Sequence, residues 1–249
     1  MIVLPTEKVK PKVINPRFLI LFGKPKSGKT TMVSKLDNNL IIDLEGGSEF
    51  LEALSVQART VKDLGDIAQA IREKNAEQNK FFYKYITIDN ASRLEEIVLP
   101  YAAQLYKNTS LGAKWQGTDV RQLPKGAGWA YIWEAVKKVI RMFRELCETL
   151  ILVGHTKDKM IEIEGTELSE MQLDLAGKLS DIICGEADAI AYVYRKKNQT
   201  ILSFKGGESC VREARADHIR GQNIIIAESD ENNNIVTHWE KVFLPELES

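Results

Sequence analysis

An eight-residue segment with two glycines, residues 23–30, constrains this chain more than any other feature. It reads Gly-Lys-Pro-Lys-Ser-Gly-Lys-Thr, which has the spacing of loops that hold nucleotide phosphates. The continuous apolar run at 18–22 precedes it, a pattern typical of a strand buried on both faces of a parallel sheet. Residues 29–36 are predicted to be helical. A strand, a glycine-rich turn and a helix in this order predict a phosphate-binding loop; the alternative is a lysine-rich turn that matches by chance.

The chemistry of such a loop gives a task to each residue type. Glycines let backbone N–H groups approach phosphate oxygens, a lysine contacts the β- and γ-phosphates, and a hydroxyl completes the coordination of Mg²⁺. Here the lysine is Lys29 and the hydroxyl is that of Thr30, and the N-terminus of the next helix adds its dipole. The predicted nucleotide-binding residues are Gly23, Lys24, Pro25, Lys26, Ser27, Gly28, Lys29, Thr30 and Thr31. The predicted cofactors are ATP and Mg²⁺.

Two carboxylates at the ends of predicted strands complement the loop. Asp89 follows an apolar run and is predicted to hold Mg²⁺ with Thr30; the alternative is that Asp89 or Asn90 only caps the next helix. Hydrolysis also needs a base that orients water toward the γ-phosphate. Asn90 stands where many ATPases place a glutamate, so we expect the base elsewhere. Glu45 ends the predicted strand 40–44, at the edge where such sheets bind ligands; the alternative is an exposed loop acid.

The order of predicted elements divides the chain into two patterns. Strands and helices alternate as far as residue 154, which is typical of a parallel sheet flanked by helices. Two hairpin signals follow, formed by predicted strands at 187–194 and 200–204 and at 224–227 and 235–239. The predicted fold is α/β, a mainly parallel sheet flanked by helices with an antiparallel C-terminal extension. We expect an extended N-terminal arm at 1–16, an ATPase core at 17–228, and a C-terminal hairpin with an acidic tail at 229–249.

Composition argues against several classes of protein. The 34 basic and 35 acidic residues nearly cancel, so no overall field draws the chain toward nucleic acid or membrane. Neither a CxxC pair nor metal-ligand spacing of histidines is found among the three cysteines and three histidines, so no zinc site or disulfide framework is indicated. No apolar stretch approaches the roughly 18 residues of a membrane span, and no signal-peptide core follows Met1. We expect a soluble, cytoplasmic protein with no membrane partner, in the bacterial host cytoplasm if a phage encodes it.

Four segments in this order, 23–30, 43–47, 86–90 and 152–155, resemble the RecA-like ATPases. Within that family the chain resembles, over about residues 17–206, the phage nucleotide-binding proteins proposed to act as single-strand annealing recombinases. The resemblance implies a RecA-like fold with Glu45 as the catalytic glutamate. It also implies that His155, where RecA normally has glutamine, senses the γ-phosphate. This departure changes how the nucleotide state is relayed; the alternative is a strand-end histidine whose hydrogen bonds are satisfied.

RecA-like proteins bind DNA through two loops, and the resemblance places them here at 108–128 and 157–174. From 107 to 144 the chain has eight Lys or Arg residues against two acids. Aromatic residues interleave with that charge, as a stacking platform for single strands requires; they are Trp115, Trp129, Tyr131 and Trp133. The alternative is that Trp129 and Trp133 lie on the buried face of a helix. The predicted DNA-binding residues are Lys114, Trp115, Arg121 and Lys125. The segment 157–174 is expected to be irregular, and its six acids argue against direct DNA contact.

The resemblance also implies a ring or filament of identical subunits in which lysines after a late strand reach the ATP site of a neighbour. Lys196 and Lys197 stand at that position, and Arg195 or Lys205 are alternatives for the same role. A cation supplied in trans commonly completes the charge balance at a γ-phosphate in transfer. A solvated hairpin edge is the competing interpretation of this basic cluster.

Together these features predict a DNA-dependent ATPase that hydrolyses ATP to ADP and phosphate. It would bind single-stranded DNA and promote annealing or strand exchange in phage-type homologous recombination, with a single-strand binding protein as a possible partner. One alternative is a nucleotide-gated interaction or loader module with little hydrolysis. The other is a P-loop small-molecule kinase, which would need an arginine-rich lid over its acceptor.

Overall fold

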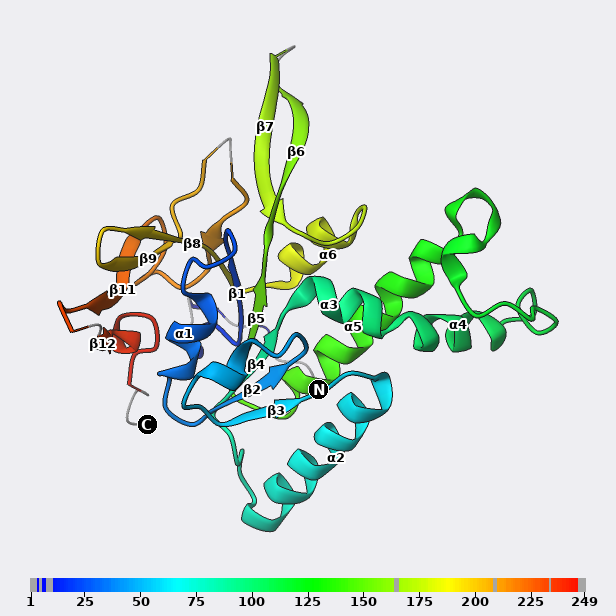
Figure 1. Cartoon of the computed structure of the whole chain (residues 1–249), viewed down its shortest axis with the longest axis horizontal. Helices are drawn as coiled ribbons and strands as arrows, with labels where there is room; N and C mark the ends of the chain where they lie inside the picture. Colours follow the sequence, from blue (N-terminus) through cyan, green and yellow to red (C-terminus); the bar gives the residue numbers. More distant parts are fainter. Residues whose placement is uncertain are drawn as a thin grey trace.

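The computed structural model describes residues 4, 6–7, 11–163, 166–207, 210–232 and 234–245. Its strands are β1 Phe18–Phe22, β2 Asn39–Asp43, β3 Ser55–Gln57, β4 Tyr85–Asp89, β5 Thr149–Gly154, β6 Thr156–Ile163, β7 Thr166–Leu173, β8 Ala189–Lys196, β9 Gln199–Ser203, β10 Glu213–Ala214, β11 Asn223–Ser229 and β12 Ile235–Thr237. Its α-helices are α1 Lys29–Ser34, α2 Val61–Gln78, α3 Ala91–Ile97, α4 Leu99–Lys107, α5 Gly128–Arg144 and α6 Leu179–Glu186. Short 3-10 turns lie at η1 Gly47–Phe50, η2 Val120–Gln122, η3 Pro124–Gly126 and η4 Trp239–Lys241. Figure 1 shows their arrangement.

One sheet organises the molecule, with the strand order β12-β11-β9-β8-β1-β5-β4-β2-β3 and β10 paired to β8. The six strands from β3 to β8 in this order pair in parallel. Pairing becomes antiparallel from β8 onward through β9, β11 and β12. The predicted fold class, a mainly parallel α/β sheet with an antiparallel C-terminal extension, is therefore confirmed.

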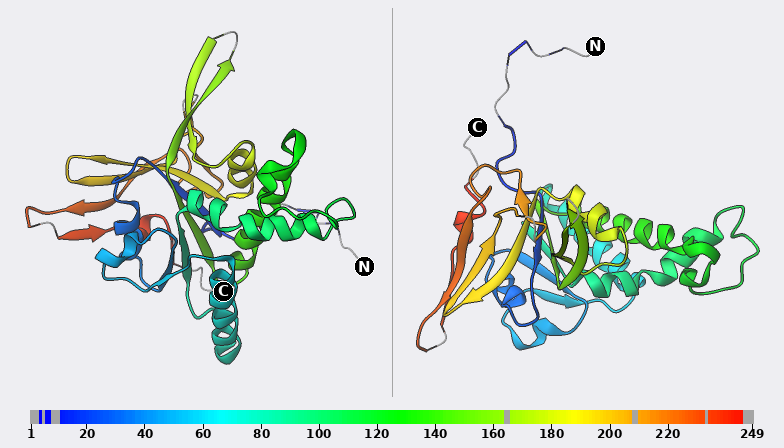
Figure 2. Two further views of the ribbon diagram at one scale, coloured as in Figure 1. Left: turned by 45° about the vertical axis from the view of Figure 1, so that its right-hand side comes forward. Right: turned by 90° about the horizontal axis from the view of Figure 1, so that it is seen from above.

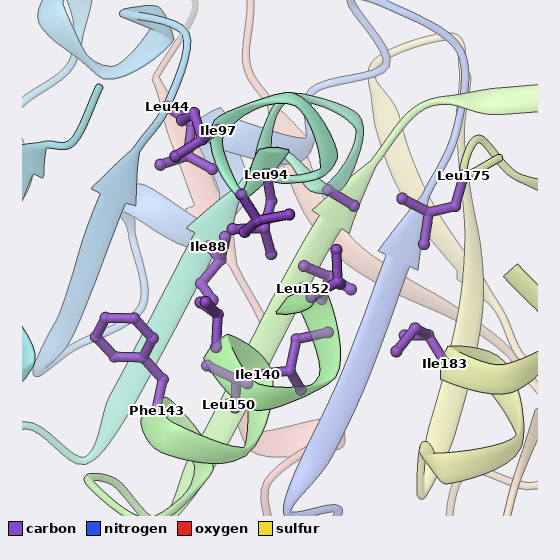
Figure 3. Close-up of a cluster of buried hydrophobic side chains, with 14 of the residues drawn as sticks. Leu44, Ile88, Leu94, Ile97, Ile140, Phe143, Leu150, Leu152, Leu175 and Ile183 are labelled. Atoms are coloured by element: carbon purple, nitrogen blue, oxygen red, sulfur yellow. The ribbon is translucent and has the colours of Figure 1, made fainter. Parts of the chain in front are cut away.

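The central strand β1 explains why its sequence is apolar throughout. Phe18, Ile20 and Phe22 belong to one buried cluster, with side chains of α2, α3, α5 and α6. Figure 3 shows part of this cluster, in which Ile140 and Phe143 of α5 and Ile183 of α6 pack over the strands. The intervening residues Leu19 and Leu21 belong to the cluster on the opposite face. Both faces of β1 are covered, so alternation of polar and apolar residues is absent from it.

The opposite face is covered by α1 and by the last described residues of the chain. Met32 and Val33 of α1 pack there with Trp239, Val242 and Phe243. Trp239 Nε1 donates a hydrogen bond to the carbonyl oxygen of Met32 at 3.0 Å. The C-terminal segment is thus part of the core beneath the helix that follows the glycine-rich loop.

The segment 157–174 differs from its prediction, because it forms the antiparallel hairpin β6–β7 instead of an irregular loop. Its register runs from Thr156 opposite Leu173 to Ile163 opposite Thr166. The hairpin forms a sheet of its own and projects away from the main sheet in Figure 1. A ribbon of this kind satisfies its backbone groups internally, so charged residues can occupy both strands without burial.

Helices α4 and α5 pack together to form an arm at the end of the molecule opposite the antiparallel strands, as Figure 2 shows. Two helices follow β4, because α3 ends at Ile97 and α4 begins at Leu99. Pro100 lies in the first turn of α4, where its missing N–H is tolerated, but it cannot continue a helix from α3. Among the described residues, no helix combines the length and the apolar character that crossing a bilayer requires.

Candidate nucleotide-binding site

The glycine-rich loop lies at the carboxyl edge of the parallel strands, between β1 and α1 (Figure 1). Its first residue, Gly23, donates its N–H to the carbonyl oxygen of Gly154 at 3.2 Å. A Cβ atom at Gly23 would lie 2.3 Å from the carbonyl oxygen of Val193, so only glycine fits between the neighbouring strands. Gly28 has φ 91° and forms the N-terminal boundary of α1, a conformation that favours glycine. The backbone therefore requires glycine at both positions, for close approach at Gly23 and for a positive φ at Gly28.

Lys29 is buried beneath this loop. Its Nζ donates to the carbonyl oxygens of Gly23 at 2.8 Å and Lys24 at 2.9 Å, and to Ser27 Oγ at 3.3 Å. Burial lowers the pKa of Lys29 to about 8, against the opposing effect of nearby Asp89 and Glu45. A partly desolvated ammonium group inside a loop is a strong ligand for phosphate, because little water must be removed when the anion binds.

Thr30 and Asp89 meet beside the loop, as a shared Mg²⁺ site requires. Thr30 Oγ1 donates to Asp89 Oδ2 at 2.5 Å. Burial raises the pKa of Asp89, the hydrogen bond from Thr30 opposes that rise, and the nearby carboxylates of Asp43 and Glu45 add to it. The neighbouring Asn90 is the residue that caps α3, since its Oδ1 accepts from the N–H of Arg93 at 2.9 Å. The Asp89 carboxylate instead faces the loop.

Asp43 organises the turn that carries Glu45, a role that the sequence interpretation missed. Its Oδ1 accepts from the N–H groups of Glu45 at 2.9 Å and Gly46 at 2.6 Å. Its Oδ2 accepts from Ser48 N–H at 2.8 Å and Ser48 Oγ at 2.6 Å. Burial by itself would raise the pKa of Asp43, but these hydrogen bonds outweigh it and the pKa is lowered. An aspartate at a strand end before Glu-Gly-Gly-Ser is a recognisable signal for such a turn.

Glu45 and His155 face each other across the edge of the sheet. His155 Nε2 lies 3.9 Å from Glu45 Oε2, and the glutamate side chain is 47% exposed. His155 Nδ1 is buried and has no hydrogen-bond partner within the described part of the chain. The two side chains come from the ends of β2 and β5, strands that are separated by β4 in the sheet.

These side chains line one pocket of about 150 Å³. Its lining residues are Lys26, Ser27, Gly28, Lys29, Thr30, Thr31, Asp43, Glu45, Gly47, Asp89 and His155. Strand register explains the convergence, because Phe22 pairs with Gly154 and Asp43 pairs with Asp89. Gly23, Lys24 and Pro25 of the predicted loop do not line this pocket.

The donor set of the pocket suits ATP with Mg²⁺. Mg²⁺ prefers oxygen ligands and usually combines one or two protein groups with waters and substrate phosphates. Thr30 Oγ1 and an Asp89 oxygen supply such ligands, and Lys29 with the loop N–H groups would receive the phosphates. Within the described ranges, no group of three or more His, Cys, Asp or Glu side chains is arranged to hold a metal by itself. The protein groups therefore fit a metal ion that arrives with the nucleotide.

Lys196 and Lys197 lie at the end of β8 and in the turn before β9. Both are exposed, and Lys197 has φ 55°. Neither lines the pocket of its own subunit. The role of these two lysines in trans stays a prediction.

The predicted DNA-binding residues lie on the loop that joins α4 to α5, remote from the pocket (Figure 1). The ring of Trp115 packs edge-on against Tyr106 at a centroid distance of 5.2 Å, and Lys107 Nζ lies 5.5 Å from its centroid. Arg121 forms an ion pair with Asp119 at 2.6 Å. The other two residues, Lys114 and Lys125, are exposed. All four aromatic residues of the predicted platform, Trp115, Trp129, Tyr131 and Trp133, are partly buried against the helical core.

Similarity to known proteins indicates the family of this chain. A family model described as an AAA domain matches residues 15–223. No curated protein matches the chain. Among solved structures, the chain is similar to one described as the crystal structure of the RadB recombinase, with a TM-score of 0.48 and 9% sequence identity. That similarity covers 89% of this chain and 91% of the other.

Proposed function

We propose that this chain, which belongs to the AAA domain family, is an ATPase that acts on single-stranded DNA in annealing or strand exchange of the phage recombination type. The observation that carries the ATPase part is the pocket in which Lys29, Thr30, Asp89 and Glu45 converge. The exposed lysines Lys114 and Lys125 and the ring of Trp115, all in the α4–α5 loop, support the DNA part. The chain is a P-loop NTPase by its family. The ATPase part and the DNA part of the proposal both assume that it binds a nucleotide.

Each residue of the pocket has a chemical task in this proposal. Lys29 and the loop N–H groups would bind and neutralise the phosphates, and Thr30 with Asp89 would hold a Mg²⁺ ion, which supplies charge stabilisation to the phosphates when bound. Glu45 accepts a proton from the attacking water, since its carboxylate is open to solvent at the pocket. His155 donates toward the γ-phosphate or orients Glu45. Asp43 keeps the Glu45 turn in place by accepting its N–H.

The decisive experiment for this function is ATPase activity titrated with single-stranded and double-stranded DNA. Release of phosphate that increases with single-stranded DNA supports the proposal. A phosphorylated acceptor in place of free phosphate would support the kinase alternative.

A nucleotide-gated interaction module is the second candidate, and the looseness of Glu45 is the observation that favours it. The Glu45 side chain is half exposed, and its contact with His155 Nε2 is long, at 3.9 Å. A base that is not held firmly activates water poorly. Tight ATP binding with negligible turnover, with or without DNA, would support this candidate.

Binding of single-stranded DNA is expected to involve the α4–α5 loop. Trp115→Ala should weaken binding by about 1–3 kcal/mol if a base stacks on the ring, whereas Trp115→Phe should retain most of the affinity. Binding should fall steeply with salt, and Lys114→Ala or Lys125→Ala should each reduce the salt slope by about 1. Fluorescence anisotropy with a labelled oligonucleotide measures all three effects. Salt-insensitive binding, or none at any salt, would favour the interaction module.

Lys196 and Lys197 are expected to act in the ATP site of a neighbouring subunit. Glu45→Gln subunits lack the base but keep the lysines, and the double variant Lys196→Ala/Lys197→Ala keeps the base but lacks the lysines. Each preparation should be inactive alone, and mixing them should restore part of the ATPase activity. Partial recovery is expected because some mixed interfaces join an intact base to intact lysines. A mixture that stays inactive, although both variants oligomerise, would exclude action across the interface.

A further inference from the structure

A second pocket adjoins the glycine-rich loop on the side of the antiparallel strands. It shares Gly28 and Thr31 with the pocket of Glu45, and β8, β9, β11 and β12 contribute to its remaining wall. A Cβ atom at Gly28 would lie 3.4 Å from Thr200 Oγ1 and 3.8 Å from Arg195 Nε. Arg195 and Thr200 therefore lie against the loop of their own subunit, at the residue that precedes α1.

The charges in this second pocket leave Arg195 without a counterion. Arg195 is exposed and forms no ion pair with any residue that the structure describes. The acid in the same lining, Glu228, is engaged elsewhere: its Oε1 accepts from Gln199 at 2.8 Å and its Oε2 lies 3.5 Å from His238 Nε2. An arginine fork beside a phosphate-binding loop, with the acid of the same lining already engaged, is suited to bind an anion.

Alternation along β8 separates Arg195 from the two lysines that follow it. Ala191 and Val193 belong to the buried cluster on the α1 face, whereas Ile190 and Tyr192 pack on the opposite face. Side chains two residues apart share a face of a strand, so Arg195 follows Val193 onto the α1 face. Lys196 is on the opposite face and lines neither pocket. Arg195 and Lys196 therefore lie on opposite faces of β8, and only Arg195 is on the face of α1.

We propose that Arg195 binds the phosphate chain of the nucleotide held by its own subunit. The inference rests on the proposed function, in which the γ-phosphate lies beside Glu45 and Asp89. A nucleotide placed in this way passes Gly28 and Thr31, and a Cβ atom at Gly28 would lie 3.8 Å from Arg195 Nε. Arg195 is the cation in the described lining of the second pocket, and it contributes to affinity in cis. Lys196 and Lys197 contribute in trans.

The first test compares the affinity for Mg²⁺-ADP of the parent, Arg195→Ala, Arg195→Gln and Arg195→Lys by isothermal titration calorimetry. Loss of a charge-assisted contact should weaken binding about tenfold in the Ala and Gln variants, and the Lys variant should recover part of it. Arg72→Ala, a matched change at an exposed arginine of α2, should bind as the parent does. Equal affinity of the parent and Arg195→Ala, or of the Gln and Lys variants, would overturn the inference and leave the proposed function intact. A parent protein that binds no nucleotide would overturn both.

The second test separates action in cis from action in trans by mixing subunits. Arg195→Ala subunits mixed with Glu45→Gln subunits should show no more ATPase activity at subsaturating ATP than the two preparations show separately. If Arg195 acts in cis, each Arg195→Ala subunit lacks the arginine at its own site and each Glu45→Gln subunit lacks the base at its own site. No arrangement of neighbouring subunits then creates a complete site. Recovery in this mixture would overturn the inference, because it requires Arg195 to reach a neighbour's site.

Discussion

Lys29→Ala should weaken ATP binding by a factor of about 10 to 150, the range expected when a charge-assisted contact of roughly 1.5–3 kcal/mol is lost. The physical reason is that Nζ is already held inside the loop by the carbonyl oxygens of Gly23 and Lys24. It therefore meets an incoming phosphate without reorganisation. Calorimetric titration with Mg²⁺-ATP measures the change. Lys80→Ala, which removes an exposed lysine after α2, is the matched control and should bind as the parent does.

The same experiment has a pH signature. The pKa of Lys29 is lowered to about 8 by burial, so the side chain is mainly charged at pH 7 and mainly neutral at pH 9. ATP binding at pH 9 must then take up a proton, and the affinity should fall by up to about tenfold per pH unit above pH 8. Lys29→Ala should lose this dependence. Unchanged ATP affinity in Lys29→Ala would contradict the phosphate-binding role of the loop.

The parallel part of the fold follows from the sequence because its strands are short apolar runs covered on both sides. Residues 18–22 and 85–88 have that pattern, and they became β1 and β4. The hairpin β6–β7 was missed because β6 begins with three successive charged residues at 157–159 and β7 contains no continuous apolar run. Strand β3 was missed as well, since it has three residues and two of them are exposed. Pairing with β2, a tertiary contact, creates it.

The sequence predicted most residues of the candidate site but missed the position of Arg195, for a related reason. Lys29, Thr30, Asp89, Glu45 and His155 each lie at the end of a predicted strand or in the loop, and carboxyl ends of parallel strands share one edge. The sequence was therefore sufficient to predict that these side chains lie close together. The position of Arg195 beside Gly28 could not be predicted in this way. It depends on β8 pairing with β1, a contact between distant parts of the chain that local patterns do not contain.

Glu45→Gln should bind ATP with the affinity of the parent and lose most of its turnover. A glutamine amide keeps the size of the side chain and the N–H contact of residue 45 with Asp43, but it cannot accept a proton from water. General-base catalysis contributes roughly 10²- to 10⁴-fold, and a loss of that size is expected in kcat. Steady-state phosphate release and calorimetric binding of Mg²⁺-ATP measure the two effects separately.

The matched control for this loss is Glu52→Gln, the same change at an exposed acid that does not line the pocket. It should hydrolyse ATP at the parent rate. The combination of normal ATP binding and slow turnover in Glu45→Gln alone identifies a residue that acts on the water. Weakened ATP binding would instead indicate that Glu45 serves the ground state, for example by supporting Lys29 electrostatically. Hydrolysis at the parent rate would exclude Glu45 as the base. His155, whose Nε2 lies 3.9 Å from Glu45 Oε2, would then be the next candidate for that role.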